Sequence, residues 1–182
     1  MLDKKKKMVI YLEITMVSAV AFALSYVPLQ LFHAAIDLSL GFIPIAILAV
    51  RRGIFPAMIA GAIWGVLAIL TGKAEFLTIL QVMMDYPVAF SFGGLVGIFS
   101  FQIKVKRKFI FWIILASFLG AFARWFWHFV AGFLFWGNYA PKSMNPFFYS
   151  LLVNGISCIL NALILSVVLI FVVKKAKFLL SD

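Results

Sequence analysis

Asp85 and His128 are the residues of this sequence with the clearest capacity for chemistry, because both lie inside long apolar stretches. An ionisable side chain inside a membrane costs about 2.5 to 3.5 kcal/mol on insertion scales, so it is usually kept for function or for pairing. We therefore expect a functional role for Asp85 and His128. Arg124 precedes His128 by one helical turn and needs the same explanation. It could pair with Asp85 or point at a cytoplasmic water cavity, and we expect a structural or gating role for it.

Aromatic and amide side chains surround these residues at a similar depth. Counted at 1.5 Å per residue from the ends of their apolar stretches, Asp85, His128 and Asn154 lie about 10 to 14 Å below the outer surface. The nearby aromatic residues are Tyr86, Trp125, Trp127, Trp136, Tyr139 and Tyr149. A buried carboxylate between aromatic faces suits a cationic, ring-shaped ligand, since each cation–π contact contributes about 0.5 to 2 kcal/mol. The pattern predicts a substrate pocket open to the outside, although Trp136, Tyr139 and Tyr149 are also typical of an interfacial aromatic belt.

The elements that must hold these side chains are predicted to be membrane-spanning helices. The chain of 182 residues is 65% apolar and only 12% charged, which excludes a soluble domain. Its long continuous apolar stretches indicate helices, because backbone polar groups in lipid must be satisfied within each segment. We expect a single transmembrane substrate-binding domain over residues 1–182. Its six helices are predicted at about 8–29, 34–50, 54–71, 76–101, 109–135 and 147–173.

The distribution of positive charge predicts the topology. Most of the sixteen Lys and Arg residues fall in four clusters between apolar stretches, at residues 4–7, 51–52, 104–108 and 174–177. Loops rich in Lys and Arg remain on the cytoplasmic side of a membrane, so the chain must cross twice between successive clusters. This arrangement predicts an all-α, multi-pass protein of the cell membrane with both termini in the cytoplasm. It also argues against nucleic-acid binding as the reason for the excess positive charge.

Motifs for catalysis, cofactors and metals are missing from the sequence. It contains no HExxH motif, no His/Cys cluster with metal-ligand spacing and no GxSxG nucleophile motif. An enzyme that activates water with Asp85 and His128 is therefore the weaker alternative, and we expect neither a cofactor nor a metal. Ala19 and Ala23 are spaced four residues apart on the first helix, which allows close approach of another helix.

Several segments together resemble the thiamine-specific S components of energy-coupling factor (ECF) vitamin transporters. They are Arg51-Arg52-Gly53, Gly61-Ala62-Ile63-Trp64-Gly65, Thr71-Gly72, Asp85-Tyr86, His128-Phe129-Val130-Ala131-Gly132, Phe135-Trp136 and Tyr149-Ser150-Leu151-Leu152-Val153-Asn154-Gly155. The similarity keeps the same order and spacing from about Glu13 to Lys175, so it covers nearly the whole chain.

This resemblance implies a six-helix subunit that captures thiamine from the outer side with high affinity and has no catalytic activity. Its partners would be a transmembrane coupling protein, contacted through Ala19 and Ala23, and two ATPase subunits that drive toppling of the S component. Thiamine would be the transported ligand, with no cofactor. The binding residues implied by the family pattern are Asp85, Tyr86, His128, Trp136, Tyr149 and Asn154.

The chain departs from the family pattern at three places. Asp85 stands where the family has Glu, Glu75 stands where a Tyr follows the third helix, and the first loop reads Phe32-His33-Ala34-Ala35 without a Trp. His33 or Phe32 could take the role of the missing aromatic residue. We also expect thiamine diphosphate to bind more weakly than thiamine, because its phosphates would approach Asp85 or Glu75. An S component for a related vitamin or a thiamine precursor, a membrane enzyme and a structural scaffold remain as alternatives.

Overall fold

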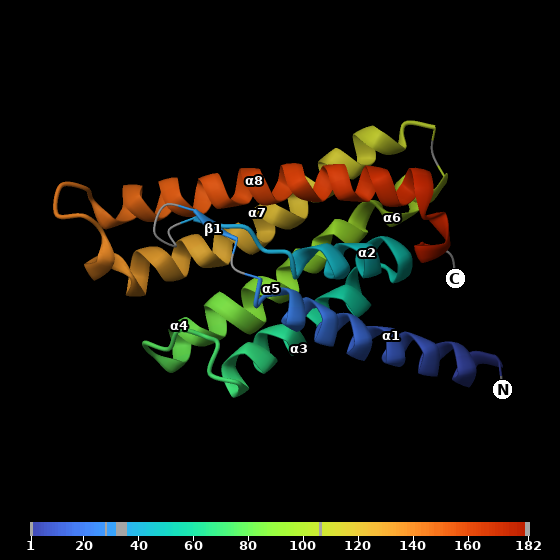
Figure 1. The fold of residues 1–182 in the computed structure, drawn as a ribbon, viewed down its shortest axis with the longest axis horizontal. Coiled ribbons are helices and arrows are strands. Elements are labelled where there is room, and N and C mark those ends of the chain that lie inside the picture. Colours follow the sequence, from blue (N-terminus) through green and yellow to red (C-terminus); the bar gives the residue numbers. More distant parts are fainter. Residues whose placement is uncertain (1, 28, 32–35, 106, 181–182) are drawn as a thin grey trace.

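The computed structural model describes residues 2–27, 29–31, 36–105 and 107–180, and it is a bundle of helices (Figure 1). Five continuous helices carry most of the fold. They are α1 (Leu2–Leu24), α2 (Phe42–Arg52), α3 (Ile54–Leu70), α7 (Phe109–Phe135) and α8 (Pro146–Lys175). Two short 3₁₀ turns, η3 (Gly137–Tyr139) and η4 (Lys177–Leu179), follow α7 and α8. Residue Gly53 alone joins α2 to α3, with the positive φ of 88° that glycine adopts without strain.

The fourth predicted helix is one span built from five consecutive segments. It runs through α4 (Ile79–Met83), the π-helical η1 (Met84–Val88), α5 (Ala89–Phe92), the 3₁₀-helical η2 (Gly93–Phe99) and α6 (Ser100–Val105). Pro87 lies inside the π-helical segment, where its missing N–H interrupts regular α-helical hydrogen bonding. The span still covers 27 residues, which is long enough to cross a membrane.

The second helix is shorter than the sequence predicted. In place of a helix over 34–50, an antiparallel pair of two-residue strands, β1 (Gln30–Leu31) and β2 (Ile36–Asp37), precedes α2, which begins only at Phe42. Pro44 is the third residue of α2, a position where the absent N–H costs no helical hydrogen bond, so it favours a helix start nearby. At 11 residues, α2 extends only about 16 Å, roughly half the hydrocarbon core. Residues 34 and 35 of the predicted helix lie outside the described residues.

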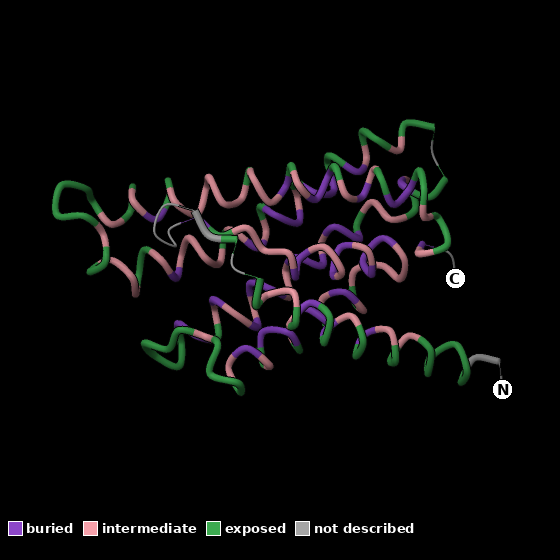
Figure 2. The backbone as a smooth tube through the Cα atoms, viewed as in Figure 1, coloured by how far each residue is buried: buried purple, intermediate pink, exposed green. Residues whose placement is uncertain are grey.

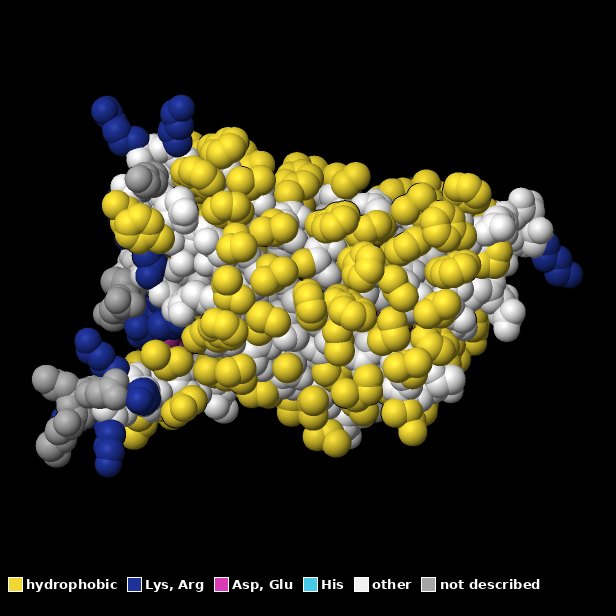
Figure 3. All heavy atoms as spheres, turned by 180° about the vertical axis from the view of Figure 1, so that it is seen from behind, with side chains coloured by type: hydrophobic (Ala, Val, Ile, Leu, Met, Phe, Trp, Pro, Cys, Tyr) yellow, Lys and Arg dark blue, Asp and Glu magenta, His cyan; other side chains and the backbone are white. Residues whose placement is uncertain are grey.

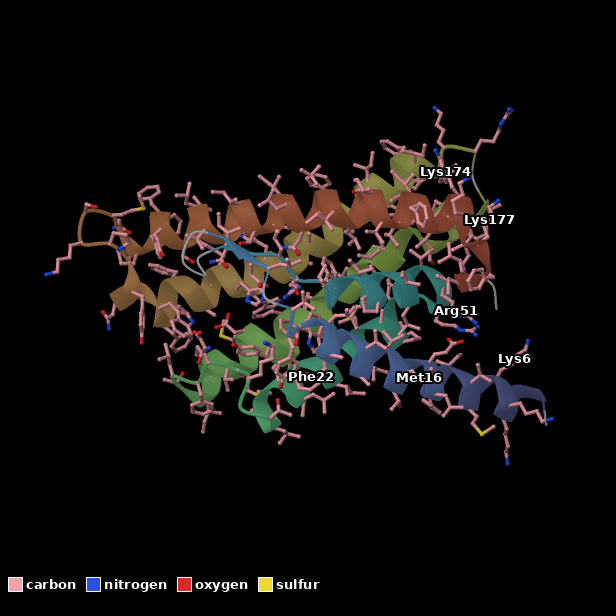
Figure 4. All side chains as sticks on the ribbon, in the orientation of Figure 1. Lys6, Met16, Phe22, Arg51, Lys174 and Lys177 are labelled. Atoms are coloured by element: carbon pink, nitrogen blue, oxygen red, sulfur yellow. The ribbon has the colours of Figure 1, made fainter. Side chains whose placement is uncertain are left out.

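With the composite span counted once, the described residues form the six predicted helices, and both termini lie at the same end of the bundle (Figure 1). Four of the helices are long and apolar enough to cross a membrane. Lys and Arg side chains gather at the end that carries the termini, while apolar side chains cover the surface between the two ends (Figure 3). Lys6, Arg51, Lys174 and Lys177 all lie at this basic end (Figure 4). That this end faces the cytoplasm stays a prediction.

Burial is uneven along the bundle. Fully buried residues concentrate where α2 and α3 cross the composite span, as at Ile45, Ala49 and Ala57, each 0% exposed. The half of α8 nearer the termini adds Leu165 and Leu169 to this core. Toward the other end, α7 and α8 are mostly half-buried or exposed (Figure 2). The less densely packed end is where a ligand cavity could form.

Candidate functional site

A cavity of about 380 Å³ opens among the halves of the helices that lie away from the termini. This volume lies within the range of about 300 to 1,000 Å³ that small-molecule sites occupy. Residues after α1, around β2, on α3, on the composite span, on α7 and on α8 all contribute to its wall. The polar and aromatic residues of that wall include Asp37, Trp64, Lys73, Glu75, Asp85, Tyr86, Phe90, Arg124, Trp125, His128, Trp136, Asn154, Ser157 and Asn161.

Asp85 is the acceptor at the centre of the hydrogen-bonding network in this wall. Its Oδ1 lies 3.1 Å from His128 Nδ1, and its Oδ2 accepts hydrogen bonds from Trp136 Nε1 at 3.1 Å and Gln81 Nε2 at 2.8 Å. Asp85 is only 8% exposed, so these bonds replace the water that its carboxylate has lost. The structure thus brings together Asp85, His128 and Trp136, three of the residues predicted for the site.

Glycines on α3 allow the backbone that carries Asp85 to approach closely. A Cβ at Gly65 would lie 2.5 Å from Pro87 N and from the Tyr86 carbonyl carbon, both in η1. One turn earlier, Gly61 faces the backbone of Phe90 in the same way. Because these positions lack side chains, α3 supports the π-helical segment from behind. The small residues Gly61 and Gly65 on α3 therefore have a specific packing partner, the backbone of the span that carries Asp85.

Arg124 also lines the cavity, but it reaches Asp85 only through His128. Its Nε donates to His128 Nε2 at 3.4 Å, and its guanidinium lies 4.5 Å from the ring centre of Phe90 and 5.3 Å from that of Trp64. Among the described residues, no carboxylate forms an ion pair with Arg124. If Nε2 of His128 accepts from Arg124, then Nδ1 carries the proton and donates it to Asp85. The two contacts together fit a His128 ring that carries its proton on Nδ1.

The side of the cavity formed by α8 also holds the segment around β2. Asn154 lines the cavity, and its amide donates to Ser150 O at 3.0 Å. One and two turns further along α8, Ser157 Oγ accepts from Asp37 N, and Asn161 donates to Asp37 O at 2.7 Å. Asn161 Oδ1 also accepts from the backbone N–H of residue 39 at 2.8 Å. Side chains of α8 thus satisfy the backbone of the segment that replaces the predicted helix.

The rim of the cavity carries charge of both signs. Asp37 and Glu75 line it without forming an ion pair in the described part of the chain, and Lys73 lies 4.6 Å from the ring centre of Tyr26. Tyr86 also lines the cavity, and its hydroxyl accepts a hydrogen bond from Glu75 N at 2.8 Å. Two unpaired carboxylates at the opening would attract a cationic ligand.

Three predicted aromatic residues are not among the described residues that line the cavity. Trp127 packs against the ring of Phe92 instead. Tyr149 is half-buried at the start of α8 and is not among the described residues that line the cavity, so its role stays a prediction. Tyr139 is 64% exposed, in agreement with an interfacial position. Phe32 and His33, considered for the first loop, lie outside the described residues. Ala19 and Ala23 are exposed on α1, where they remain available for a partner.

Gln81, Asp37 and Asn161 belong to the site and were not identified from the sequence. Gln81 precedes Asp85 by four residues, a spacing that places two helical side chains on the same face. Asn154, Ser157 and Asn161 follow a similar spacing along α8. Asp37 is an acidic residue inside the helix predicted over 34–50, and an ionisable residue in an apolar stretch indicates a functional role.

Comparison with known proteins places the chain among transporters. Residues 11–181 match the family described as thiamine transporter protein (Thia_YuaJ). The thiamine transporter ThiT of Lacticaseibacillus paracasei is 41% identical over 92% of this chain and 88% of its own length. ThiT of Bacillus subtilis is 28% identical over 100% of this chain and 98% of its own. A solved structure of ThiT from Listeria monocytogenes superimposes with a TM-score of 0.93 at 37% identity, covering 97% of this chain and 100% of that one.

Proposed function

Because the chain belongs to the thiamine transporter protein family, we propose that it is the high-affinity thiamine-binding S component of an ATP-driven ECF importer. Membership of this family makes it a multi-pass membrane transport protein and not an enzyme. The observation that carries the finer proposal is the Asp85 carboxylate, held by three donors in the wall of a cavity of about 380 Å³.

The chemistry of the wall supports a particular orientation of thiamine. Asp85 is an acceptor and would receive a hydrogen bond from the amino group of the aminopyrimidine ring. The neighbouring faces of Tyr86 and Trp136 would stack against the rings, and Asn154 would help to orient them. The positively charged thiazolium would lie toward Glu75 and away from the Arg124 guanidinium, because like charges repel in a site of low dielectric.

The same rim charges support discrimination against phosphorylated thiamine. A diphosphate attached beyond the thiazolium would bring negative charge toward Glu75 and Asp37. We therefore propose that unphosphorylated thiamine is the preferred ligand. Equal affinities for thiamine and its diphosphate in one titration series would contradict this part of the proposal.

The exposed face of α1 supports a partner within the membrane. Only 17% of the residues in the most apolar stretch of α1 are buried. Beside Ala19 and Ala23, the side chains of Met16 and Val20 are 66% and 49% exposed. Two small residues one turn apart let a second helix approach closely. We propose that the transmembrane coupling protein packs here, and that two ATPase subunits complete the importer.

Thiamine binding can be tested by titrating the detergent-purified protein while recording tryptophan fluorescence, since Trp64, Trp125 and Trp136 line the cavity. Saturable quenching by thiamine, but not by riboflavin or biotin, is the expected result. Asp85→Asn should weaken binding by at least about tenfold, because a charged acceptor becomes a neutral amide. No response of the wild-type protein to thiamine would refute the proposal, while a response to a different vitamin would assign the chain another ligand.

A further inference from the structure

Gln81 is fully buried beside the site and lies behind the cavity wall. It is 0% exposed and is not among the described residues that line the cavity. Its amide Nε2 donates to Asp85 Oδ2 at 2.8 Å and to Glu75 O at 3.2 Å, while its Oε1 accepts from Leu77 N at 2.9 Å. Both amide hydrogens are thereby used, so the orientation of the side chain is fixed by its partners.

The amide determines which oxygen of Asp85 is left for a ligand. A carboxylate can accept about four hydrogen bonds, two on each oxygen. Gln81 and Trp136 both donate to Oδ2, whereas Oδ1 receives only His128 Nδ1. One acceptor direction on Oδ1 therefore remains for a donor that enters the cavity.

The same amide attaches Asp85 to the loop between α3 and α4. The amide has two backbone partners in that loop, Glu75 O and Leu77 N. The loop forms another hydrogen bond to the span, in which Glu75 N donates to Tyr86 Oη at 2.8 Å. The two residues that would meet the ligand's rings, Asp85 and Tyr86, are thus each connected to the segment that carries Glu75 at the rim.

We propose that Gln81 is a positioning residue that holds Asp85 so that Oδ1 faces the ligand, and that it thereby sets the preference for a ligand bearing an amino group. The inference rests on the proposed function, in which that group is the amine of the aminopyrimidine. Gln81 does not touch the ligand and acts only through Asp85 and the loop at the rim. Its loss leaves Trp136 as the one donor to Oδ2 among the described residues and lets the carboxylate rotate away from the orientation that an amine requires.

The test compares Gln81→Leu with Gln102→Leu, a matched substitution at the other end of the same span. Gln102 Oε1 is buried without a hydrogen-bond partner in the described structure, so its loss disturbs no network. Each protein is titrated with thiamine and with desaminothiamine, in which hydrogen replaces the pyrimidine amino group. We expect Gln81→Leu to weaken thiamine binding by about tenfold and desaminothiamine binding far less, which reduces the discrimination between them. Gln102→Leu should match the wild type.

A second variant keeps the test decisive if Gln81→Leu does not fold. In Gln81→Glu, the introduced group can donate to Asp85 when neutral, but it repels Asp85 when ionised. Thiamine binding by this variant should therefore weaken more steeply with rising pH than binding by the wild type. The other titratable and charged groups nearby are the same in both proteins. Those that line the adjoining cavity are Asp37, Lys73, Glu75, Asp85, Tyr86, Arg124, His128 and Cys158. The difference between the pH profile of thiamine binding by Gln81→Glu and that of the wild type therefore reports only the titration of the introduced carboxyl.

The outcomes separate this inference from the proposed function. Reduced discrimination in Gln81→Leu, or a steeper pH profile in Gln81→Glu, supports the positioning role. Wild-type affinity and discrimination in a folded Gln81→Leu protein, or matching pH profiles for Gln81→Glu and the wild type, would overturn it while leaving thiamine binding established. Failure of the wild type to bind thiamine would overturn the proposed function and this inference with it.

Discussion

Gly65→Ala tests whether the backbone of α3 holds the binding carboxylate in place. The new Cβ would lie 2.5 Å from Tyr86 C and Pro87 N, whereas carbon atoms in contact are normally about 3.5 to 4.0 Å apart. The η1 backbone, or α3 itself, must therefore retreat by about 1 Å. Both colliding atoms belong to the backbone, so a change of side-chain rotamer cannot relieve the overlap.

The consequence for Asp85 follows from its three hydrogen bonds of 2.8 to 3.1 Å. A displacement of about 1 Å would stretch at least one of them beyond the range of a hydrogen bond. Overpacking of a buried contact costs about 1 to 3 kcal/mol of stability. The same displacement moves Asp85 away from the ligand in the proposed binding mode. Loss of a hydrogen bond between the ligand and this charged acceptor costs about 1.5 to 3 kcal/mol, which corresponds to a loss of roughly tenfold to a hundredfold in thiamine affinity.

Thermal unfolding in detergent and fluorescence titration with thiamine would measure the two effects separately. Gly155→Ala on α8 is the matched control, because a Cβ there would meet nothing within 4 Å. The control should keep the wild-type affinity and unfold at the same or a slightly higher temperature, since Ala favours a helix over Gly. If Gly65→Ala behaved like Gly155→Ala in both measurements, the account of how α3 supports Asp85 would be wrong.

Three further substitutions probe other parts of the molecule. Asn161→Ala removes the α8 side chain that holds the segment around β2, so stopped-flow fluorescence should show thiamine dissociating several-fold faster; unchanged rates would argue against that attachment. Glu13→Gln removes the negative charge from the contacts of 2.6 and 3.0 Å with Arg52 and Arg51, and the unfolding temperature should fall by a few degrees with thiamine affinity intact; an unchanged temperature would show that this ion pair does not stabilise the fold. Ala23→Trp places a bulky side chain on the exposed face of α1, so cells should lose thiamine uptake while the purified protein still binds thiamine; normal uptake would remove α1 as the partner surface.

The central residues of the site could be predicted because an ionisable residue inside an apolar stretch can be recognised from the sequence alone. Asp85 and His128 interrupt apolar stretches, and the structure joins their side chains at 3.1 Å. The helices over Ile54–Leu70 and Phe109–Phe135 were likewise predictable from continuous hydrophobicity between charged or glycine-containing turns.

The segment before α2 could not be predicted in the same way. Its residues are mostly apolar, and a membrane helix was the natural interpretation because a non-helical backbone in lipid leaves polar groups unsatisfied. In the structure, Ser157 and Asn161 supply those hydrogen bonds from more than a hundred residues away. Local sequence contains no sign of such distant partners. The π-helical turn at Pro87 was missed for a related reason, since its stability depends on close packing against Gly65.

Arg51 has a consequence for how the protein is made. Its side chain contacts Glu13 of α1 at 3.0 Å and donates to the carbonyl oxygens of Phe178 and Leu179, while its own carbonyl accepts from Lys104. Residues 178 and 179 leave the ribosome after all six helices have been synthesised. The hydrogen bonds from Arg51 to these two carbonyl oxygens can therefore form only after the last helix has been translated. In a nascent chain stalled earlier, the Arg51 side chain at the end of α2 would lack them.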